Sequence, residues 1–226
     1  MRDRQRRPVK PTLDGEPIYE NHPYMADGSN YHQNRKKWDG VTRAMAHDVR
    51  RAAYWATLAG AAGHTYGCNH VWQFYDPKRA PAILEANTPW RKALDFPGAR
   101  QMGLLRRLLE SRPWTRLAPD DALIVEGQQP GEHHLQAART PDGGLAMVYV
   151  TLGTPLSVDL GRLARQPIHA WWFDPREGQA KKIGTWTNTG GSRRFAPPGT
   201  PGRGNDWVLV LDAAAKEPAP PGTKRD

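Results

Sequence analysis

Apolar and polar positions follow a helical period in two stretches of the chain. Between Trp38 and Ala59, apolar residues recur every three or four positions, which predicts an amphipathic helix. Asp39 is expected to cap the start of this helix, and Gly60 to end it. A second helix is predicted from Gly98 to Glu110. The apolar stripe of the first helix comprises Val41, Met45, Val49, Ala52, Ala56 and Ala59.

Short strands are predicted on either side of the first helix. One lies within residues 9–20 and ends at the turn signal Asp14-Gly15, and the other, with its exit loop, lies within His64–Trp72. The order strand, helix, strand favours two parallel strands. Residues 21–37 are polar and rich in Gly, Asn and His, and they are predicted to form a long loop.

The pattern changes from Pro119 onward, where short β-rich segments are separated by Gly, Pro and Asp turns. Strands at this spacing with no helix between them are typical of an antiparallel β-sandwich. The predicted strands are Leu123–Val125, His134–Ala138, Leu145–Val150, Leu156–Leu160, Ile168–Phe173, Lys181–Thr185, Arg193–Phe195 and Asp206–Leu211.

The predicted fold class is therefore α/β followed by all-β. Residues 1–114 form the α/β part and residues 115–212 form the sandwich. Residues 213–226 are polar and rich in proline, and they are predicted to be a disordered tail.

Charge and composition exclude several classes of protein. The 226 residues carry a net charge of +9, but the basic residues are scattered and match no nucleic-acid motif, so no nucleic-acid partner is expected. No run of about 20 apolar residues predicts a membrane span, and no apolar segment near Met1 predicts a signal peptide. A single cysteine excludes an internal disulfide framework and leaves the compartment undecided.

Two carboxylates, Glu16 and Glu20, follow the first predicted strand. In a parallel α/β barrel, the C-terminal ends of the strands carry the active site. A carboxylate at that position can act as a nucleophile or general base in glycoside chemistry, in which two carboxyl groups flank the bond that is cut. The alternative is that Glu16 only solvates a turn or pairs with a nearby arginine.

A second cluster of polar and aromatic side chains ends the second predicted strand. Polar groups of this kind bond sugar hydroxyls and an aromatic face stacks on a sugar ring, so the cluster is a candidate substrate-binding site. Packing is the alternative for any single member. The cluster consists of His64, Tyr66, Asn69, His70 and Trp72.

Other chemistries find less support in the sequence. No metal site is expected, because the two histidines of this cluster have no carboxylate between them and the side chains of His133 and His134 would point to opposite faces of a strand. Cys68 could be a nucleophile, but a lone cysteine beside a strand is more often a small buried residue. No serine lies in a G-x-S-x-G elbow, and no phosphate-binding glycine loop is present, so no cofactor is expected.

The chain also resembles a known family. Its first part resembles the last part of an apiosidase-like glycoside hydrolase barrel of the DUF4038 type, a (β/α)8 fold, and its second part resembles the β-sandwich labelled as a collagen-binding domain of a collagenase. The first resemblance is carried by Lys10–Glu20, Val49-Arg50, Leu58–Gly67 and Val71-Trp72. The second is carried by Pro97–Met102, Ser111–Trp114, Trp172–Pro175 and Asp206–Leu211.

The resemblance implies roles for individual residues. It makes Glu16 the nucleophile at the end of the seventh barrel strand, with Glu20 as the fallback, and it places His64, Tyr66 and Trp72 in the sugar subsite of the eighth strand. A (β/α)8 barrel needs about 250 residues. About 118 residues precede the sandwich strands here, so the first six barrel units and the acid/base carboxylate of the fourth strand are expected to be absent.

The expected function is therefore that of the C-terminal portion of a retaining glycoside hydrolase acting on plant or other polysaccharides. This chain alone is expected to show little or no hydrolysis. The alternative is a non-catalytic accessory protein that binds carbohydrate or, through the sandwich, collagen or a similar extracellular ligand. The family is mostly secreted or periplasmic, although the sequence itself does not predict a location.

Overall fold

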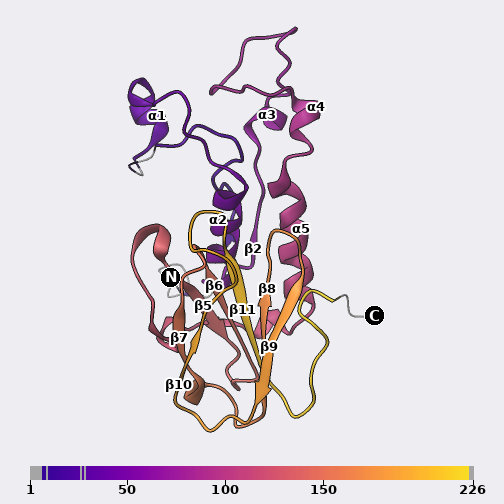
Figure 1. The fold of residues 1–226 in the computed structure, drawn as a ribbon. Coiled ribbons are helices and arrows are strands. Elements are labelled where there is room, and N and C mark those ends of the chain that lie inside the picture. The colour runs from indigo at the N-terminus through magenta and orange to yellow at the C-terminus, as the bar shows by residue number, and fades with distance from the viewer. Residues whose placement is uncertain (1–6, 9, 26, 28, 224–226) are drawn as a thin grey trace.

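The computed structural model describes residues 7–8, 10–25, 27 and 29–223. Its secondary structure forms layers: a pair of short parallel strands, two long helices, a six-stranded sheet and a three-stranded sheet (Figure 1). Val9, in the first predicted strand, and residues 224–226 of the predicted tail lie outside the described residues. Among the helices of the described part, none has the length and apolar character that crossing a membrane requires.

The first part of the chain contains the predicted strand–helix–strand unit. β1 (Leu13–Asp14) and β2 (Gly63–His64) pair in parallel. A further parallel bridge joins Glu20 to Cys68, so the two segments remain side by side beyond the strands themselves. The connection between the strands is α2 (Ala46–Leu58), which contacts β2 on one side and the six-stranded sheet on the other.

The start of α2 differs from the prediction. The helix begins at Ala46 rather than at Trp38. Asp39 does not cap it, because the Asp39 carboxylate accepts a hydrogen bond of 2.8 Å from the backbone N–H of Thr42 and closes a separate turn. The helix is capped instead by Asp48, whose Oδ2 accepts a hydrogen bond of 2.9 Å from the backbone N–H just before the first helical residue.

The buried face of α2 also differs from the predicted apolar stripe. Val41 and Met45 are 76% and 56% exposed, whereas Tyr54 and the charged side chains of Asp48 and Arg50 are buried. Predicting the buried face of a helix from its apolar positions assumes that charged side chains face water. That assumption fails here because other layers cover both sides of α2 and its charged groups find partners in the sandwich.

The other helices confirm one prediction and change another. The second predicted helix is α5 (Pro97–Glu110). Residues 21–37, predicted as a loop, contain α1 (Tyr31–Asn34), whose first turn is capped by the side chain of Asn30, and a 3₁₀ turn at Arg35–Lys37. Two further short helices are α3 (Asn69–Trp72) and α4 (Trp90–Ala93).

The second part of the chain is two antiparallel sheets packed face to face, as predicted. The six-stranded sheet has the order β3-β5-β6-β11-β8-β9, and the three-stranded sheet has the order β10-β7-β4. The strands are β3 (Ala118–Pro119), β4 (Ile124–Glu126), β5 (Gln136–Arg139), β6 (Leu145–Val150), β7 (Leu156–Asp159), β8 (Ile168–Phe173), β9 (Ala180–Trp186), β10 (Ser192–Phe195) and β11 (Trp207–Ala213). Short 3₁₀ turns lie at Trp114–Arg116, Asp121–Leu123, Gly131–His133 and Leu160–Arg162.

Two hydrophobic cores lie on opposite faces of the six-stranded sheet. One fills the space between the sheets and includes Val148 and Leu209. The other lies between the sheet and the helices α2 and α5, and includes Tyr54, Leu108 and Tyr149. The central strands β6, β8 and β11 are therefore buried on both faces, which explains why their sequences are nearly continuous apolar runs.

A buried ion pair joins the helices to the sandwich. Arg50 of α2 donates hydrogen bonds of 2.6 and 2.8 Å to the carboxylate of Asp206, which directly precedes β11, and these side chains are 3% and 0% exposed. The Tyr149 hydroxyl donates a further hydrogen bond of 2.9 Å to Asp206. Burial acts to raise the pKa of Asp206, but hydrogen bonds from Arg50 and His47 outweigh it and hold that pKa below its ordinary range.

Within the stretch predicted to be a disordered tail, Ala213 belongs to β11, and Ala219 and Gly222 contact the end of α5. The backbone N–H of Gly222 donates a hydrogen bond of 2.9 Å to the Ser111 hydroxyl, and the guanidinium of Arg112 donates one of 2.8 Å to the carbonyl of Ala219. A proline-rich segment loses less backbone entropy on ordering, so a few such contacts suffice to hold it.

We expect Arg50→Ala to lower the free energy of unfolding by about 3–5 kcal/mol, because it leaves the Asp206 carboxylate buried without its main partner. Chemical denaturation monitored by circular dichroism measures the change. Arg106→Ala is the matched control, since Arg106 forms an ion pair with Glu110 on the exposed face of α5 and should change stability little. Equal effects of the two substitutions would contradict the structural role assigned to the buried pair.

Candidate active site

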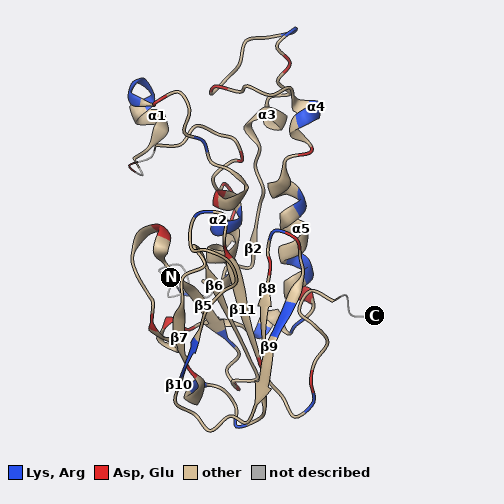
Figure 2. Ribbon diagram, viewed as in Figure 1, with Lys and Arg blue, Asp and Glu red and all other residues tan. Residues whose placement is uncertain are grey.

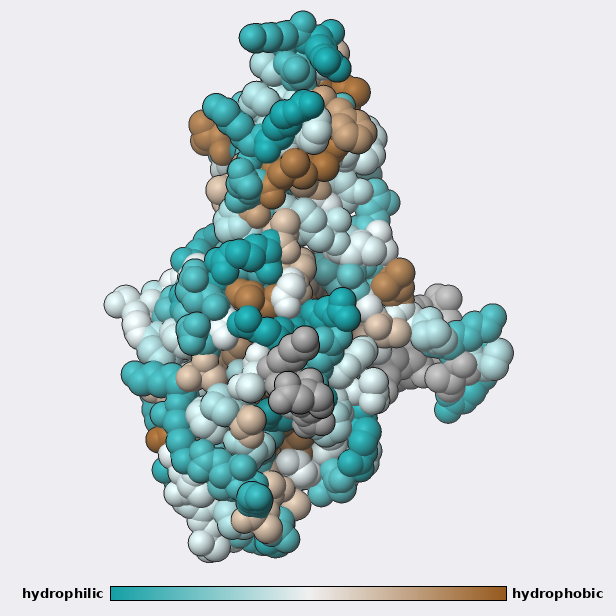
Figure 3. All heavy atoms as spheres, turned by 90° about the vertical axis from the view of Figure 1, so that its right-hand side faces the viewer, coloured by the Kyte–Doolittle hydropathy of each residue, from teal (hydrophilic) through white to brown (hydrophobic). Residues whose placement is uncertain are grey.

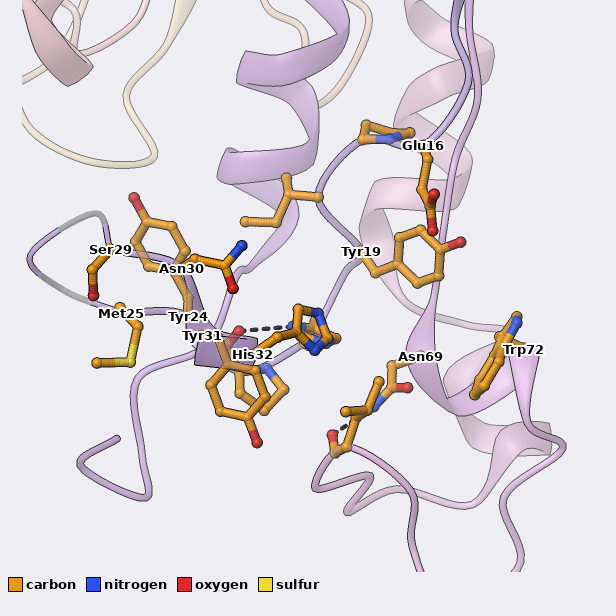
Figure 4. Close-up of a pocket in the computed structure, with 15 residues that line it drawn as sticks. Glu16, Tyr19, Tyr24, Met25, Ser29, Asn30, Tyr31, His32, Asn69 and Trp72 are labelled. Carbon is orange, nitrogen blue, oxygen red and sulfur yellow. Dashed lines mark hydrogen bonds between the residues drawn. The ribbon is translucent and has the colours of Figure 1, made fainter. Parts of the chain in front are cut away.

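An open hollow of about 540 Å³ lies beyond the C-terminal ends of β1 and β2 (Figure 4). Glu16, Tyr19 and Trp72 lie on one side of it, and side chains from the segment that contains α1 lie on the other. Its wall combines aromatic, amide, hydroxyl and imidazole groups with a carboxylate: Glu16, Tyr19, His22, Tyr24, Ser29, Asn30, Tyr31, His32, Asn69 and Trp72. Such a wall suits a ligand that has many hydroxyl groups and a flat apolar face.

Glu16 is the carboxylate that lines this hollow. It lies two residues beyond β1, is exposed, and is followed by Pro17, which restricts the backbone. In the part of the chain that the structure describes, no hydrogen bond or ion pair to another protein group restrains the Glu16 side chain. Both carboxylate oxygens are therefore available to a ligand.

Glu20 lies in a different environment although it is only four residues away. It is 2% exposed. One of its oxygens accepts a hydrogen bond of 2.6 Å from the Tyr66 hydroxyl, and the other accepts one of 3.1 Å from the backbone N–H of Gly98. Gly98 lies in the first turn of α5, where unpaired N–H groups and the helix dipole favour a negative charge. Glu20 therefore serves as a cap that ties the β1 segment to α5.

Two glycines make this packing possible. A side chain at Gly98 would place its Cβ 2.3 Å from a carboxylate oxygen of Glu20, and one at Gly67 would place its Cβ 2.2 Å from the ring of Tyr19. The absence of side chains at these positions lets Glu20 reach the start of α5 and lets the Tyr19 ring pack directly against the backbone at Gly67.

Tyr66 acts through Glu20 rather than at the hollow of Glu16. Burial, reinforced by the hydrogen bond to the Glu20 carboxylate, raises the pKa of Tyr66 well above its usual value, so its hydroxyl remains a donor. Tyr66 does line a neighbouring hollow of about 400 Å³, whose wall also includes Tyr19, Trp72 and Leu94. Tyr19 and Trp72 thus border both hollows, and Trp72 is 58% exposed.

The sequence places Asn69 and His70 together, but the structure gives them different neighbours. Asn69 lines the hollow of Glu16 and donates a hydrogen bond of 2.8 Å to the carbonyl of Leu84. His70 is fully buried, and its Nε2 accepts a hydrogen bond of 3.1 Å from the backbone N–H of Asn87. Burial lowers the pKa of His70, partly offset by the side chain of Asn87. Both residues hold the long loop that follows α3.

His64 lies apart from the other predicted site residues. Its Nδ1 is 3.0 Å from a carboxylate oxygen of Asp14, and its side chain borders a cavity between α2, β2 and α5 that shares no lining residue with the hollow of Glu16. Of the five predicted substrate-binding residues, the structure thus brings Asn69 and Trp72 to the wall that contains Glu16.

Sequence reasoning missed the opposite wall of the hollow. In and around α1, the rings of His22, Tyr31, His32 and Trp38 pack against one another at centroid distances of 5.4–5.9 Å. Burial lowers the pKa of His22, partly offset by its hydrogen bond to the carbonyl of Pro23. The polar character of the segment suggested a loop, whereas the density of aromatic residues is the signal that points to a packed wall.

Hydrophobic residues gather on the part of the surface around α3 and α4 (Figure 3). The large exposed apolar side chains of this region are Trp72, Phe74, Ile83 and Leu94. Phe74 meets the ring of Trp90 edge to face at 5.5 Å. Among the described residues, no group of three or more His, Cys, Asp or Glu side chains is placed to hold a metal ion.

We expect Glu20→Gln to lower the free energy of unfolding by about 1–3 kcal/mol, because it weakens two buried hydrogen bonds to a charged acceptor. Glu16→Gln, in the same motif, should leave stability nearly unchanged because the Glu16 side chain is exposed. Thermal or chemical denaturation measures the stability of the two variants against that of the unchanged chain. Comparable losses in both would mean that the two carboxylates do not differ in their structural role.

Comparison with protein families divides the chain at the same place as the fold. Residues 1–116 match the family described as "Apiosidase-like, catalytic domain", and residues 118–212 match the one described as "Putative collagen-binding domain of a collagenase". Among curated protein sequences, none matches the chain significantly.

Two solved structures resemble nearly the whole chain. One, titled a glycoside hydrolase, is 33% identical with a TM-score of 0.83, and 96% of this chain aligns with 45% of that protein. The other, a glycoside hydrolase family 5 protein from Bacteroides vulgatus ATCC 8482, is 31% identical with a TM-score of 0.82, and 97% of this chain aligns with 46% of it. The chain thus spans a little less than half the length of these proteins. It belongs to the apiosidase-like glycoside hydrolase family, and its second part to the family of the collagen-binding sandwich.

Proposed function

We propose that this chain supplies one wall of a glycoside hydrolase active site, with Glu16 as the nucleophile. The observation that carries the proposal is the position of Glu16: an unrestrained carboxylate in an open hollow at the C-terminal ends of two parallel strands, beside the aromatic faces of Tyr19 and Trp72. Glu20, its alternative in the sequence, has both oxygens engaged and serves as a structural cap.

The strand pair and its helices correspond, in this proposal, to the last two units of a (β/α)8 barrel. Within the described residues, β1 and β2 pair only with each other, so each keeps one unpaired edge. Leu13 of β1 is 63% exposed. Further parallel strands would satisfy the edges and cover Leu13, as the first six units of a barrel do.

The number of carboxylates in the hollow decides which part of the glycosidase reaction this chain can supply. A retaining glycosidase uses two carboxyl groups about 5–5.5 Å apart, one to attack the anomeric carbon and one to protonate the leaving oxygen. Among the described residues that line the hollow, Glu16 is the only carboxylate. The acid/base group would therefore come from the units that complete the barrel. Tyr19 and Trp72 would stack on the sugar, and Asn69 would bond its hydroxyls.

The substrate class proposed is the polysaccharides of plants or similar sources. This class rests on the family and on the wall of the hollow, whose hydroxyl, amide and aromatic groups suit neutral sugar rings. The identity of the sugar depends on the units that would complete the barrel, because these would supply the remaining walls of the site.

The test compares the chain alone with a fusion in which residues 7–223 replace the matching half of the Bacteroides vulgatus relative. On a panel of 4-nitrophenyl glycosides, we expect no turnover by the chain alone and turnover by the fusion. Glu16→Gln should reduce kcat of the fusion by roughly a thousandfold or more, as loss of a covalent nucleophile does. Full activity of the Glu16→Gln fusion, or efficient hydrolysis by the chain alone, would contradict the proposal.

A second candidate function, binding of a carbohydrate or collagen-like polymer, belongs to the sandwich. It is supported by the family match of residues 118–212 and by the edge strands β9 and β10, which expose several Lys and Arg residues (Figure 2). There the guanidinium of Arg193 lies 3.7 Å from the centre of the Trp186 ring, a flat surface that combines charge with an aromatic group.

We expect the full chain to be retained on insoluble polysaccharide or on fibrillar collagen, and Arg193→Ala to weaken retention severalfold because it removes the exposed half of this pair. Arg194→Ala, which changes the neighbouring exposed position of β10, is the matched control. Retention on neither matrix, or equal retention of both variants, would remove this candidate.

A further inference from the structure

A second cavity, of about 360 Å³, lies beside β2. It is open to solvent, as the hollow of Glu16 is, and is bordered by the end of α2, by β2 and by one face of α5. Most of its wall is apolar or weakly polar: Thr57, Ala62, Met102, Leu105, Leu109 and Trp114. Arg106 and Glu110 also border it, but their side chains form an ion pair of 2.7 Å and so offset each other's charge.

His64 contributes the strongly polar group of this wall, and its side chain is 4% exposed. Nδ1 lies 3.0 Å from the Asp14 carboxylate, which can only accept a hydrogen bond, so Nδ1 carries the proton. Burial lowers the pKa of His64, partly offset by Asp14, and the ring is therefore neutral at pH 7 with a lone pair on Nε2.

The Nε2 atom of His64 is buried and has no hydrogen-bond partner among the residues that the structure describes. The two ring nitrogens point in nearly opposite directions, so Nε2 is directed away from Asp14 and β1. A buried acceptor without a donor costs about 1–3 kcal/mol. A ligand that donates one hydrogen bond to Nε2 would recover this energy and would bury its apolar part against the cavity wall.

We propose that this cavity is a binding site for a small, neutral aromatic molecule that carries one hydroxyl or N–H donor. A cavity of about 150 Å³ already holds benzene, so the larger volume here accommodates a substituted ring. Trp114 offers an aromatic face and Met102 a sulfur, both of which favour aromatic ligands. Access to Nε2 requires a wall side chain to move, and Met102 is unbranched and flexible.

The inference does not depend on Glu16 or on any hydrolytic activity. The cavity shares no lining residue with the hollow of Glu16. Failure of the glycosidase proposal would therefore leave this site standing, and failure at this site would leave the glycosidase proposal standing.

The test uses phenol and toluene as probes of the full chain, because they have nearly the same shape and differ in one donor. We expect phenol to bind about five- to tenfold more tightly than toluene in calorimetric titrations, the value of one buried hydrogen bond. Phenol should also shift the ¹⁵N resonance of His64 Nε2 in protein labelled at histidine, whereas toluene should not.

His64→Asn is the informative variant. The asparagine amide can still donate to Asp14 from the position of Nδ1, but it has no group at the position of Nε2. We expect phenol to bind this variant no better than toluene, while toluene binding persists and shows that the cavity is intact. An unshifted His64 Nε2 resonance at saturating phenol, equal affinities of the wild-type chain for the two probes, or an ordered water that phenol does not displace from Nε2 would overturn the proposal.

Discussion

The structure depends on one buried interaction, the ion pair between Arg50 of α2 and Asp206 at the start of β11. Taking two charges out of water is costly, and the cost is recovered only when hydrogen bonds satisfy both groups. Tyr149 and Gln101 supply the additional hydrogen bonds here. Because these four groups come from α2, α5, β6 and the approach to β11, their geometry fixes how the strand–helix–strand unit sits on the sandwich, and therefore the direction in which the hollow of Glu16 opens.

Much of the fold could be predicted from local patterns, and the failures have a common cause. The sandwich strands were predictable because turn residues separate short apolar segments, and α5 because one of its faces is apolar. The start of α2 was not, because Asp39 caps a turn that only the folded chain reveals. The burial of Arg50 was not either, because its partner lies 156 residues away. Long-range pairing of charges leaves no local signal in a single sequence.

In the candidate site, sequence alone also fails to distinguish the roles of residues, even when they are close together in the chain. Glu16 and Glu20 occur in one motif, and nothing in their spacing tells which faces a ligand. The difference arises from α5. A backbone N–H in its first turn donates a hydrogen bond to the Glu20 carboxylate, whereas Glu16 lines the hollow. The histidines were likewise indistinguishable in sequence. His70 secures a loop, whereas His64, in β2, pairs with Asp14 of β1. The aromatic wall formed by residues 21–38 was missed because polar composition was given more weight than aromatic content.

The position of α2 and α5 between two layers has a consequence for how such proteins diversify. In many multidomain enzymes an accessory module is attached by a linker and can be exchanged without harm to its neighbour. Here the six-stranded sheet covers the apolar faces of both helices, including Tyr54 and Leu108, and the chain after β11 returns to the end of α5. The sandwich and the strand–helix–strand unit thus share one hydrophobic core. Recombination that joined the strand–helix–strand unit to an unrelated module would expose that core, so the two parts are expected to be inherited as a unit.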